Sequence, residues 1–305
     1  CLVGSEMCIR DRSRTTLSMT SCTMTSMGSS KSSLALTSTA VLSALSAIGL
    51  LTGCTSSEGD SPAQEETNVP REVEHLSVSI KEHTDMLPNS FTQGLEVDPE
   101  GKLLVGTGLY GQSRLLRLQP GAKAPEQEVS LPPSLFGEGI TQTQDAIWQL
   151  TWKAGEAIKR DPVTFEETGR ARYEGEGWGL CAAGEDKSEL IMSDGSNELR
   201  HLDAQTFEET APRTPVTLEG QSVEEINELE CVDGQVFANV WMSEDILRID
   251  PTSGEVTAVI DAAGLNKSGP QTQNDVLNGI AHIPGTEEFW ITGKRWVDLY
   301  RVTFE

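Results

Sequence analysis

The sequence has little of the chemistry that nucleic-acid and zinc sites need. Lys and Arg number 23 against 47 Asp and Glu, so the formal net charge is −24. Binding phosphates requires clustered Lys and Arg, which argues against nucleic acid or an anionic membrane surface as a partner. The four histidines are scattered, and neither CxxC nor HExxH occurs. We therefore expect no metal in the catalytic chemistry.

Cysteines and long apolar runs are also scarce. Only Cys181 and Cys231 lie in residues 76–305. In an oxidising compartment they could form a disulfide, but two buried free thiols fit the sequence equally well. One long stretch, 34–51, is apolar and free of charge.

That apolar stretch belongs to a segment typical of a bacterial export signal, residues 27–53. Lys31 precedes it, and Leu51-Thr52-Gly53-Cys54 resembles a lipobox. The alternative, a single transmembrane anchor, is weaker because the stretch is short and rich in Ser and Thr. We expect cleavage before Cys54, lipidation of Cys54 as the sole membrane attachment, and a cell-envelope lipoprotein on the periplasmic or outer-membrane side.

The segments around the export signal are not expected to fold. Residues 1–26 resemble translated adapter sequence, so we treat them as a non-native leader and expect translation to begin at Met27. Residues 54–75 are rich in Ser, Glu, Pro and Gly, which predicts an acidic flexible tether.

Residues 76–305 contain short runs of alternating apolar and polar residues separated by turn residues, and this pattern predicts one all-β domain. At most, 259–265 would form a turn or two of helix. Asp161, Asp203 and Asp250 each begin a similar turn. The strands are expected at Leu103–Thr107, Leu115–Leu118, Ile147–Trp152, Ala157–Lys159, Glu189–Ser193, Glu198–Leu202, Val236–Val240, Ile246–Ile249 and Phe289–Thr292.

A repeat runs through this domain, with units that open 40 to 50 residues apart, at Gly94, Gly139, Gly179, Leu229 and Gly279. That period, with several short strands in each unit, is typical of a β-propeller. Five units predict a five-bladed β-propeller. The alternating segment Leu76–Lys81 is expected to supply the outer strand of the last blade and close the ring.

The openings of the repeats should converge at one end of the ring axis. Glu138 is notable there because it lies between Gly137 and Gly139, and glycines let another molecule approach the backbone closely. A solvated loop glutamate is the alternative from this stretch alone. The residues expected to meet are Phe91, Gln93, Glu138, Trp178, Asn227 and Asn278.

Several motifs together resemble the plant-type glutaminyl-peptide cyclotransferases, or glutamine cyclotransferases, which are five-bladed propeller enzymes with bacterial relatives. The resemblance runs in order from about 76 to 305. It implies an aminoacyl-type acyltransferase, a monomer, that converts the N-terminal Gln of peptides or proteins to pyroglutamate and releases ammonia. The motifs are Phe91-Thr92-Gln93-Gly94-Leu95, Phe136-Gly137-Glu138-Gly139, Asn227-Glu228-Leu229-Glu230, Ala238-Asn239-Val240-Trp241, Asp275-Val276-Leu277-Asn278-Gly279-Ile280-Ala281 and Ile291-Thr292-Gly293-Lys294-Arg295-Trp296.

The resemblance also implies roles for individual residues. An α-amine has a pKa of about 8, so a base must take its proton, and ammonia leaves only once protonated. Glu138 matches the family's catalytic glutamate and could shuttle that proton. Lys294 is the cation expected to polarise the amide carbonyl, with Gln93 and Asn227 as neutral donors. The walls that hold the substrate folded are expected to be Trp152, Trp178 and Trp241, with Phe91 and Phe136.

Each role has a structural alternative. Lys294 could be a solvated lysine at a strand end, and Gln93 and Asn227 could be amides that hold turns. Any of the three wall tryptophans could simply pack between blades, as we expect for Trp148, Trp290 and Trp296. Glu228 and Glu230 could be structural or could tune a neighbour's pKa, and the sequence does not choose.

Two other classes of protein remain open at this level. A non-catalytic envelope propeller that binds a ligand or partner protein would need no set of acid, lysine and tryptophans. A propeller lactone hydrolase or lyase would need a metal-binding cluster, which the histidines here do not form. A structural calcium ion along the axis is compatible with the acidic loops, although catalysis would need no cofactor.

Overall fold

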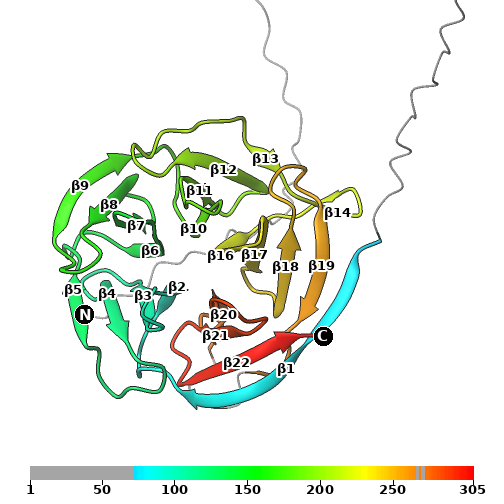
Figure 1. The fold of residues 1–305 in the computed structure, drawn as a ribbon, viewed down its shortest axis with the longest axis horizontal. Helices are drawn as coiled ribbons and strands as arrows, with labels where there is room; N and C mark the ends of the chain where they lie inside the picture. Colours follow the sequence, from blue (N-terminus) through cyan, green and yellow to red (C-terminus); the bar gives the residue numbers. More distant parts are fainter. Residues whose placement is uncertain (1–71, 266–267, 269–271) are drawn as a thin grey trace, which may run out of the picture. The chain divides into compact units, whose positions relative to one another are not determined.

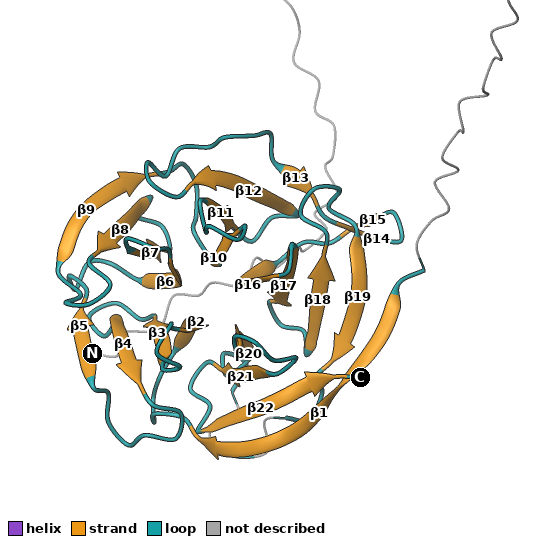
Figure 2. Cartoon of the chain, viewed as in Figure 1, coloured by secondary structure: helices purple, strands orange, loops and turns teal. Residues whose placement is uncertain are grey.

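The computed structural model describes residues 72–265, 268 and 272–305, which lie in one compact unit that begins at Glu66. Strands, and no helices, make up the regular structure of these described residues (Figure 2). The helical turn expected over 259–265 is wrong, because Val256–Asp261 pairs with two neighbouring strands as β19. The predicted leader, the export signal and Cys54 lie outside the described residues.

Three four-stranded sheets and one eight-stranded sheet, which consists of two four-stranded blades joined through β1, are arranged around one axis and confirm the five-bladed β-propeller (Figure 1). Every strand predicted from the alternating runs is present. Blade 1 contains β2 (Thr92–Val97), β3 (Leu103–Thr107), β4 (Arg114–Leu118) and β5 (Gln127–Ser130), and blade 2 contains β6 (Gly137–Gln142), β7 (Ile147–Thr151), β8 (Glu156–Arg160) and β9 (Glu167–Arg172). Blade 3 contains β10 (Leu180–Ala183), β11 (Glu189–Met192), β12 (Glu198–Asp203) and β13 (Thr214–Pro215). Blade 4 contains β16 (Ile226–Val232), β17 (Gln235–Val240), β18 (Asp245–Ile249) and β19 (Val256–Asp261). A short hairpin, β14 (Thr217–Leu218) and β15 (Gln221–Ser222), connects blades 3 and 4.

Blade 5 takes strands from both ends of the described chain. It contains β20 (Leu277–His282), β21 (Phe289–Gly293), β22 (Asp298–Phe304) and β1 (Glu74–Asp85). The second part of β1 pairs antiparallel with β22, while its first four residues pair parallel with β19 of blade 4. The outer strand predicted at 76–81 is therefore confirmed and is longer than expected, and it joins two blades (Figure 1).

The innermost strands share one irregularity. In four blades the register between the first and second strand shifts at the opening of the repeat, between Thr92 and Gly94, Gly137 and Ile140, Ile226 and Leu229, and Leu277 and Ile280. A β-bulge re-aims the side chain that it contains. Gln93, Glu138, Asn227 and Asn278 all lie within these bulges. In blade 4 the predicted repeat position is off by one residue, because the pairing makes Glu228, and not Leu229, the equivalent of Gly139 and Gly279.

The repeated glycines let the inner strands approach one another at the axis. A Cβ on Gly139 would lie 2.6 Å from the Trp178 carbonyl oxygen, and a Cβ on Gly179 would lie 2.0 Å from the Asn227 carbonyl oxygen. Neither distance is compatible with any side chain, so close packing of backbones explains why glycine recurs at the openings.

A disulfide joins two of these strands. Cys181 of β10 is bonded to Cys231 of β16, with the Cα atoms 5.4 Å apart. The structure thereby decides between the two alternatives that the sequence left open and links blade 3 covalently to blade 4.

The three aspartate turns are built alike at the outer side of their blades. The Oδ1 atoms of Asp161, Asp203 and Asp250 each accept hydrogen bonds from the backbone N–H groups two and three residues later. These bonds lower the pKa values of Asp161 and Asp203 because they stabilise the carboxylate form. The repeat noticed in the sequence is thus a repeated hydrogen-bond pattern.

Candidate active site

Glu138 is buried in the bulge of β6, with 4% of its surface exposed. Its Oε1 accepts a 2.9 Å hydrogen bond from Gln93 Nε2 of blade 1. Within the described residues, no hydrogen bond reaches its Oε2. Burial raises the pKa of Glu138 well above its ordinary value; Lys294 opposes this shift and Glu176 adds to it. Gln93 therefore orients the carboxylate, which is more basic than usual and whose Oε2 is available to another group.

Lys294 follows β21 in blade 5 and is 2% exposed, so the alternative of a solvated strand-end lysine is wrong. Its Nζ lies 5.5 Å from the centre of the Phe91 ring. Burial lowers the pKa of Lys294 from 10.5 to about 8, and Glu138 works against that shift. At neutral pH the side chain still carries its charge in an environment that disfavours it.

Glu138 and Lys294 influence each other's pKa but do not form an ion pair. Neither is paired with another charged group of the part of the chain that the structure describes. Buried charges are normally paired or hydrogen-bonded, because desolvation is costly. A buried acid and a buried base that do not pair with each other can interact with groups of another molecule.

Three buried amides lie in the same kind of bulge as Glu138. Gln93, Asn227 and Asn278 are at most 2% exposed, so they are not surface turn residues. Asn278 Nδ2 donates to the Thr92 carbonyl at 3.0 Å and approaches Gln93 Oε1 at 3.4 Å. A chain of amides therefore leads to Glu138. The side-chain amide of Asn227, by contrast, makes no hydrogen bond to any residue in the described ranges.

The predicted wall residues form an arc made of two groups of ring contacts, which Glu176 joins by binding the Trp152 and Trp178 indoles. Phe136 contacts Phe91 and Trp152, with centroids 6.1 and 5.5 Å away, and Trp178 contacts Trp241 at 6.1 Å. All three tryptophans are partly exposed, whereas Trp148, Trp290 and Trp296 are at most 7% exposed and belong to hydrophobic clusters, as predicted. Five blades thus contribute to one cluster: Phe91, Phe136 with Trp152, Trp178, Trp241 and Lys294.

Glu228 and Glu230 bind backbone rather than the cluster. Glu228 accepts the N–H groups of Leu95 and Ile280 at 3.0 and 2.9 Å, and Glu230 accepts that of His282 at 2.9 Å. Burial raises the pKa values of both glutamates. Because these bonds run from blade 4 to blades 1 and 5, they hold inner strands together.

Sequence reasoning missed Glu176. Its Oε2 accepts the indole N–H groups of Trp152 at 2.7 Å and Trp178 at 3.0 Å. The signal was present, because Gly175-Glu176-Gly177 repeats the pattern of an acid between two glycines seen around Glu138. Glu176 does not open a repeat unit, however. Its importance comes from a contact between blades, which the spacing of residues along the sequence does not reveal.

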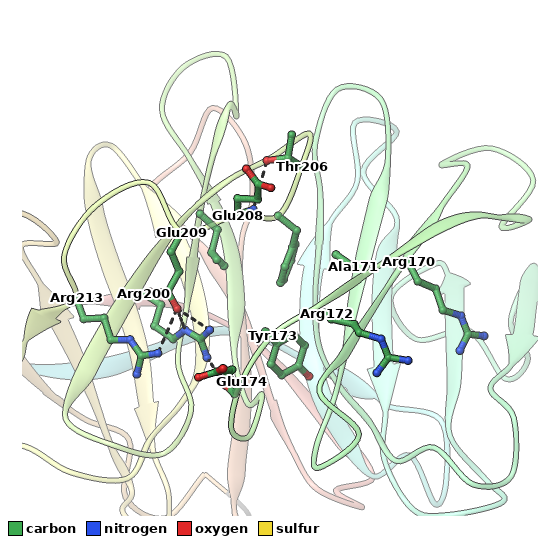
Figure 3. Close-up of a pocket in the computed structure, with 12 residues that line it drawn as sticks. Arg170, Ala171, Arg172, Tyr173, Glu174, Arg200, Thr206, Glu208, Glu209 and Arg213 are labelled. Atoms are coloured by element: carbon green, nitrogen blue, oxygen red, sulfur yellow. Dashed lines mark hydrogen bonds and ion pairs between the residues drawn. The ribbon is translucent and has the colours of Figure 1, made fainter.

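A separate hollow of about 780 Å³ lies away from this cluster, against β9, β12 and the loop that follows β12. Figure 3 shows Arg200 and Arg213 directed at the same carboxylate, that of Glu209, at 2.7 and 3.2 Å. None of the predicted site residues lines it, and its arginines are paired with acids, so we do not place the chemistry there.

No group of three or more His, Cys, Asp or Glu side chains in the described ranges could hold a metal ion. Nor does the described part of the chain contain a helix long and apolar enough to cross a membrane.

Fold and site together define a class of protein, a five-bladed β-propeller with a buried acid, a buried lysine and an aromatic arc at the openings of its blades. The chain belongs to the glutamine cyclotransferase family, whose model matches residues 49–304. It is 33% identical over 220 residues to an Arabidopsis thaliana glutaminyl-peptide cyclotransferase, covering 70% of this chain and 67% of the relative. A crystal structure of Myxococcus xanthus glutaminyl cyclase is 34% identical, with a TM-score of 0.71, covering 77% of this chain and 99% of that one.

Proposed function

We propose that this chain converts the N-terminal Gln of peptides and proteins into pyroglutamate with release of ammonia, and that Glu138 shuttles the proton. Membership of the glutamine cyclotransferase family and the two relatives support the reaction. The geometry around Glu138 supports the assignment of roles.

The reaction forms one C–N bond and breaks another. The substrate's α-nitrogen attacks the carbon of its own side-chain amide, and a five-membered ring closes. The bond from that carbon to the amide nitrogen then breaks. One proton leaves the α-nitrogen and one reaches the departing nitrogen, so a single carboxylate within reach of both can carry it. No oxidant, reductant or water is consumed.

Glu138 suits this proton transfer for two reasons. Its raised pKa lies closer to that of an α-amine, about 8, than an ordinary carboxylate's does, and matched pKa values make proton transfer efficient. Gln93 holds Oε1 and leaves Oε2 for the two substrate nitrogens. Gln93 is thus assigned to orienting the base.

Lys294 and Asn227 are assigned to the oxygen of the reacting amide. That oxygen gains negative charge when the ring closes, and donors fixed beforehand in a buried site stabilise such charge strongly. The Lys294 ammonium and the Asn227 amide are buried donors without partners among the described residues. The five aromatic residues of the arc are assigned to holding the glutamine side chain folded back on its amine.

One observation carries the assignment: Glu138 and Lys294, an acid and a base, are both buried, influence each other's pKa and do not pair. A scaffold would gain stability from joining or replacing them. A cyclotransferase needs them apart, because the two reacting nitrogens and the carbonyl oxygen must fit between.

The test is ammonia release from a Gln-initiated peptide by wild-type protein and Glu138→Gln. The variant keeps the size of the side chain but loses the base, so kcat should fall about 10²–10⁴-fold with little change in KM. Glu138→Asp should recover part of the rate, because its carboxylate is drawn back by one methylene.

Glu228→Gln is the matched control, because it also removes a buried carboxylate from an inner strand. It should melt at a lower temperature yet keep kcat within about threefold. If Glu138→Gln folds normally and retains near-full kcat, Glu138 has no part in the mechanism, and a non-catalytic propeller becomes the better interpretation.

We also propose that a lipid on Cys54 anchors the enzyme in the cell envelope, on the basis of the lipobox-like Leu51-Thr52-Gly53-Cys54. Cys54→Ala should abolish labelling by a palmitate analogue during expression in a bacterial host. Labelling of the variant equal to that of wild type would refute the anchor.

A further inference from the structure

The loop 173–178 connects the outer strand of blade 2 to the inner strand of blade 3, and one carboxylate in it contacts both blades. Trp152 directly follows β7 of blade 2, and Trp178 precedes β10 of blade 3. Glu176 Oε2 accepts both of their indole N–H groups, at 2.7 and 3.0 Å. Hydrogen bonds to an ionised acceptor are the stronger kind, so this one atom links the two indoles directly.

Backbone contacts fix the same loop to the strand that carries Glu138. Gly177 N–H donates to the Trp152 carbonyl at 3.0 Å, and Gly139 N–H donates to the Trp178 carbonyl at 2.7 Å. The Tyr173 hydroxyl donates to the Thr151 carbonyl. A change at Glu176 can therefore reach Glu138 through Trp178 and the Gly139 backbone.

The charges around the two glutamates are few. Glu138 is influenced by Lys294 and Glu176, and its own charge helps to raise the pKa of Tyr173 to about 12. Glu176 Oε1 lies 3.7 Å from Lys153 Nζ, which also lies 3.8 Å from the Trp152 ring centre. On the other side is Glu225, whose pKa is raised by burial and by Glu224 and Glu176.

We infer that Glu176 is a positioning residue of this site: its Oε2 sets the distance between the Trp152 and Trp178 indoles, and its negative charge acts on Glu138. This inference rests on the proposed function. Glu176 works through the tryptophans and Glu138, without touching the reacting atoms. Glu176 acts through its hydrogen bonds to the indoles and through its negative charge, and different substitutions can distinguish these two effects.

The experiment compares Glu176→Gln and Glu176→Ala in pH profiles of kcat/KM for one Gln-initiated peptide. Glutamine retains an oxygen for the indoles but loses the charge. The acidic limb of its profile should move to lower pH, because a negative neighbour keeps the pKa of Glu138 high. The shift should be below about one unit, since a charge 4–6 Å away moves a pKa by about 1–3 units and Glu176 is the weakest of the influences on Glu138.

Alanine loses both the charge and the hydrogen bonds. It should show the same shift and, in addition, a rise in KM of about tenfold or more, because the walls are no longer held at their spacing. Tryptophan fluorescence should change with alanine and much less with glutamine. Melting curves for both variants distinguish these changes in KM and fluorescence from unfolding of the protein.

Glu224→Gln is the matched control, because it removes an exposed charge from the neighbouring loop without a bond to any indole. It should leave the profile and KM unchanged. Profiles that do not move in either Glu176 variant, or a KM equal to wild type in Glu176→Ala, would overturn the inference. If wild type releases no ammonia, the proposed function fails instead, while altered fluorescence in Glu176→Ala still tests the contact with the indoles.

Discussion

Replacing Lys294 should abolish most of the activity and at the same time stabilise the fold. Burial lowers the pKa of this lysine from 10.5 to about 8. A difference of 2.5 units corresponds to about 3 kcal/mol, which the folded state loses at pH 7 by keeping the ammonium buried. Methionine has similar length and no charge, so Lys294→Met should recover most of this free energy.

The pH dependence of this gain has a definite sign. Between about pH 8 and 10.5 the unfolded chain binds a proton at Lys294 that the folded chain does not. Wild-type stability therefore rises with pH across this window, and the advantage of the variant shrinks from about 3 kcal/mol at pH 7 to about 1 kcal/mol at pH 10.

Denaturant titration at pH 7 and pH 10 measures this difference, and the comparison is best made in a Glu138→Gln background. There the carboxylate that shares the site cannot add its own titration. At pH 7, Glu138→Gln/Lys294→Met should melt about 6–12 °C above Glu138→Gln, since 1 kcal/mol moves the melting temperature of a domain of this size by about 2–4 °C. A double variant that is less stable than Glu138→Gln at pH 7 would refute the reasoning, because Lys294 would then be held by favourable contacts.

Two further predictions concern the framework and the chemistry. Gly179→Ala should lower the free energy of unfolding by about 3 kcal/mol or more and lower kcat/KM, because its Cβ would lie 2.0 Å from the Asn227 carbonyl oxygen. Gly169→Ala is the control, because its Cβ would meet nothing closer than 3.9 Å, and it should lower the free energy of unfolding by less than about 1 kcal/mol. Equal melting temperatures of the two variants would contradict this prediction. Since a carboxylate and an ammonium can carry the proposed reaction, EDTA should leave kcat unchanged in the ammonia assay. Loss of turnover with EDTA that zinc restores would contradict a metal-free mechanism.

The architecture was predictable because it is periodic. Alternation marks strands, and the recurrence of Gly94, Gly139, Gly179, Leu229 and Gly279 counts blades, so both the ring and its closure by the N-terminal strand follow from spacing. The repeat also predicted that Gln93, Glu138 and Asn278 converge, because equivalent bulges lie at the same end of the axis.

Contacts between blades were not predictable in the same way. The bond from Glu176 to two indoles, the disulfide and the backbone bonds of Glu228 all join residues of different units. A repeat gives each unit its fold but does not specify the rotation between units, and that rotation decides which side chains meet. The separation of Lys294 from Glu138 depends on the same rotation.

The double pairing of β1 has a consequence for how the protein is made. Among the described strands β1 is synthesised first, yet both of its partners, β19 and β22, come from the last quarter of the described chain. Its edges stay unpaired while about 170 residues up to β19 and about 210 residues up to β22 are synthesised, a time of about 10–40 s at ordinary elongation rates. An exposed strand edge invites pairing with other chains. The charged residues Glu74, Lys81, Glu82 and Asp85 along β1 are the kind that keep such an edge soluble during that wait.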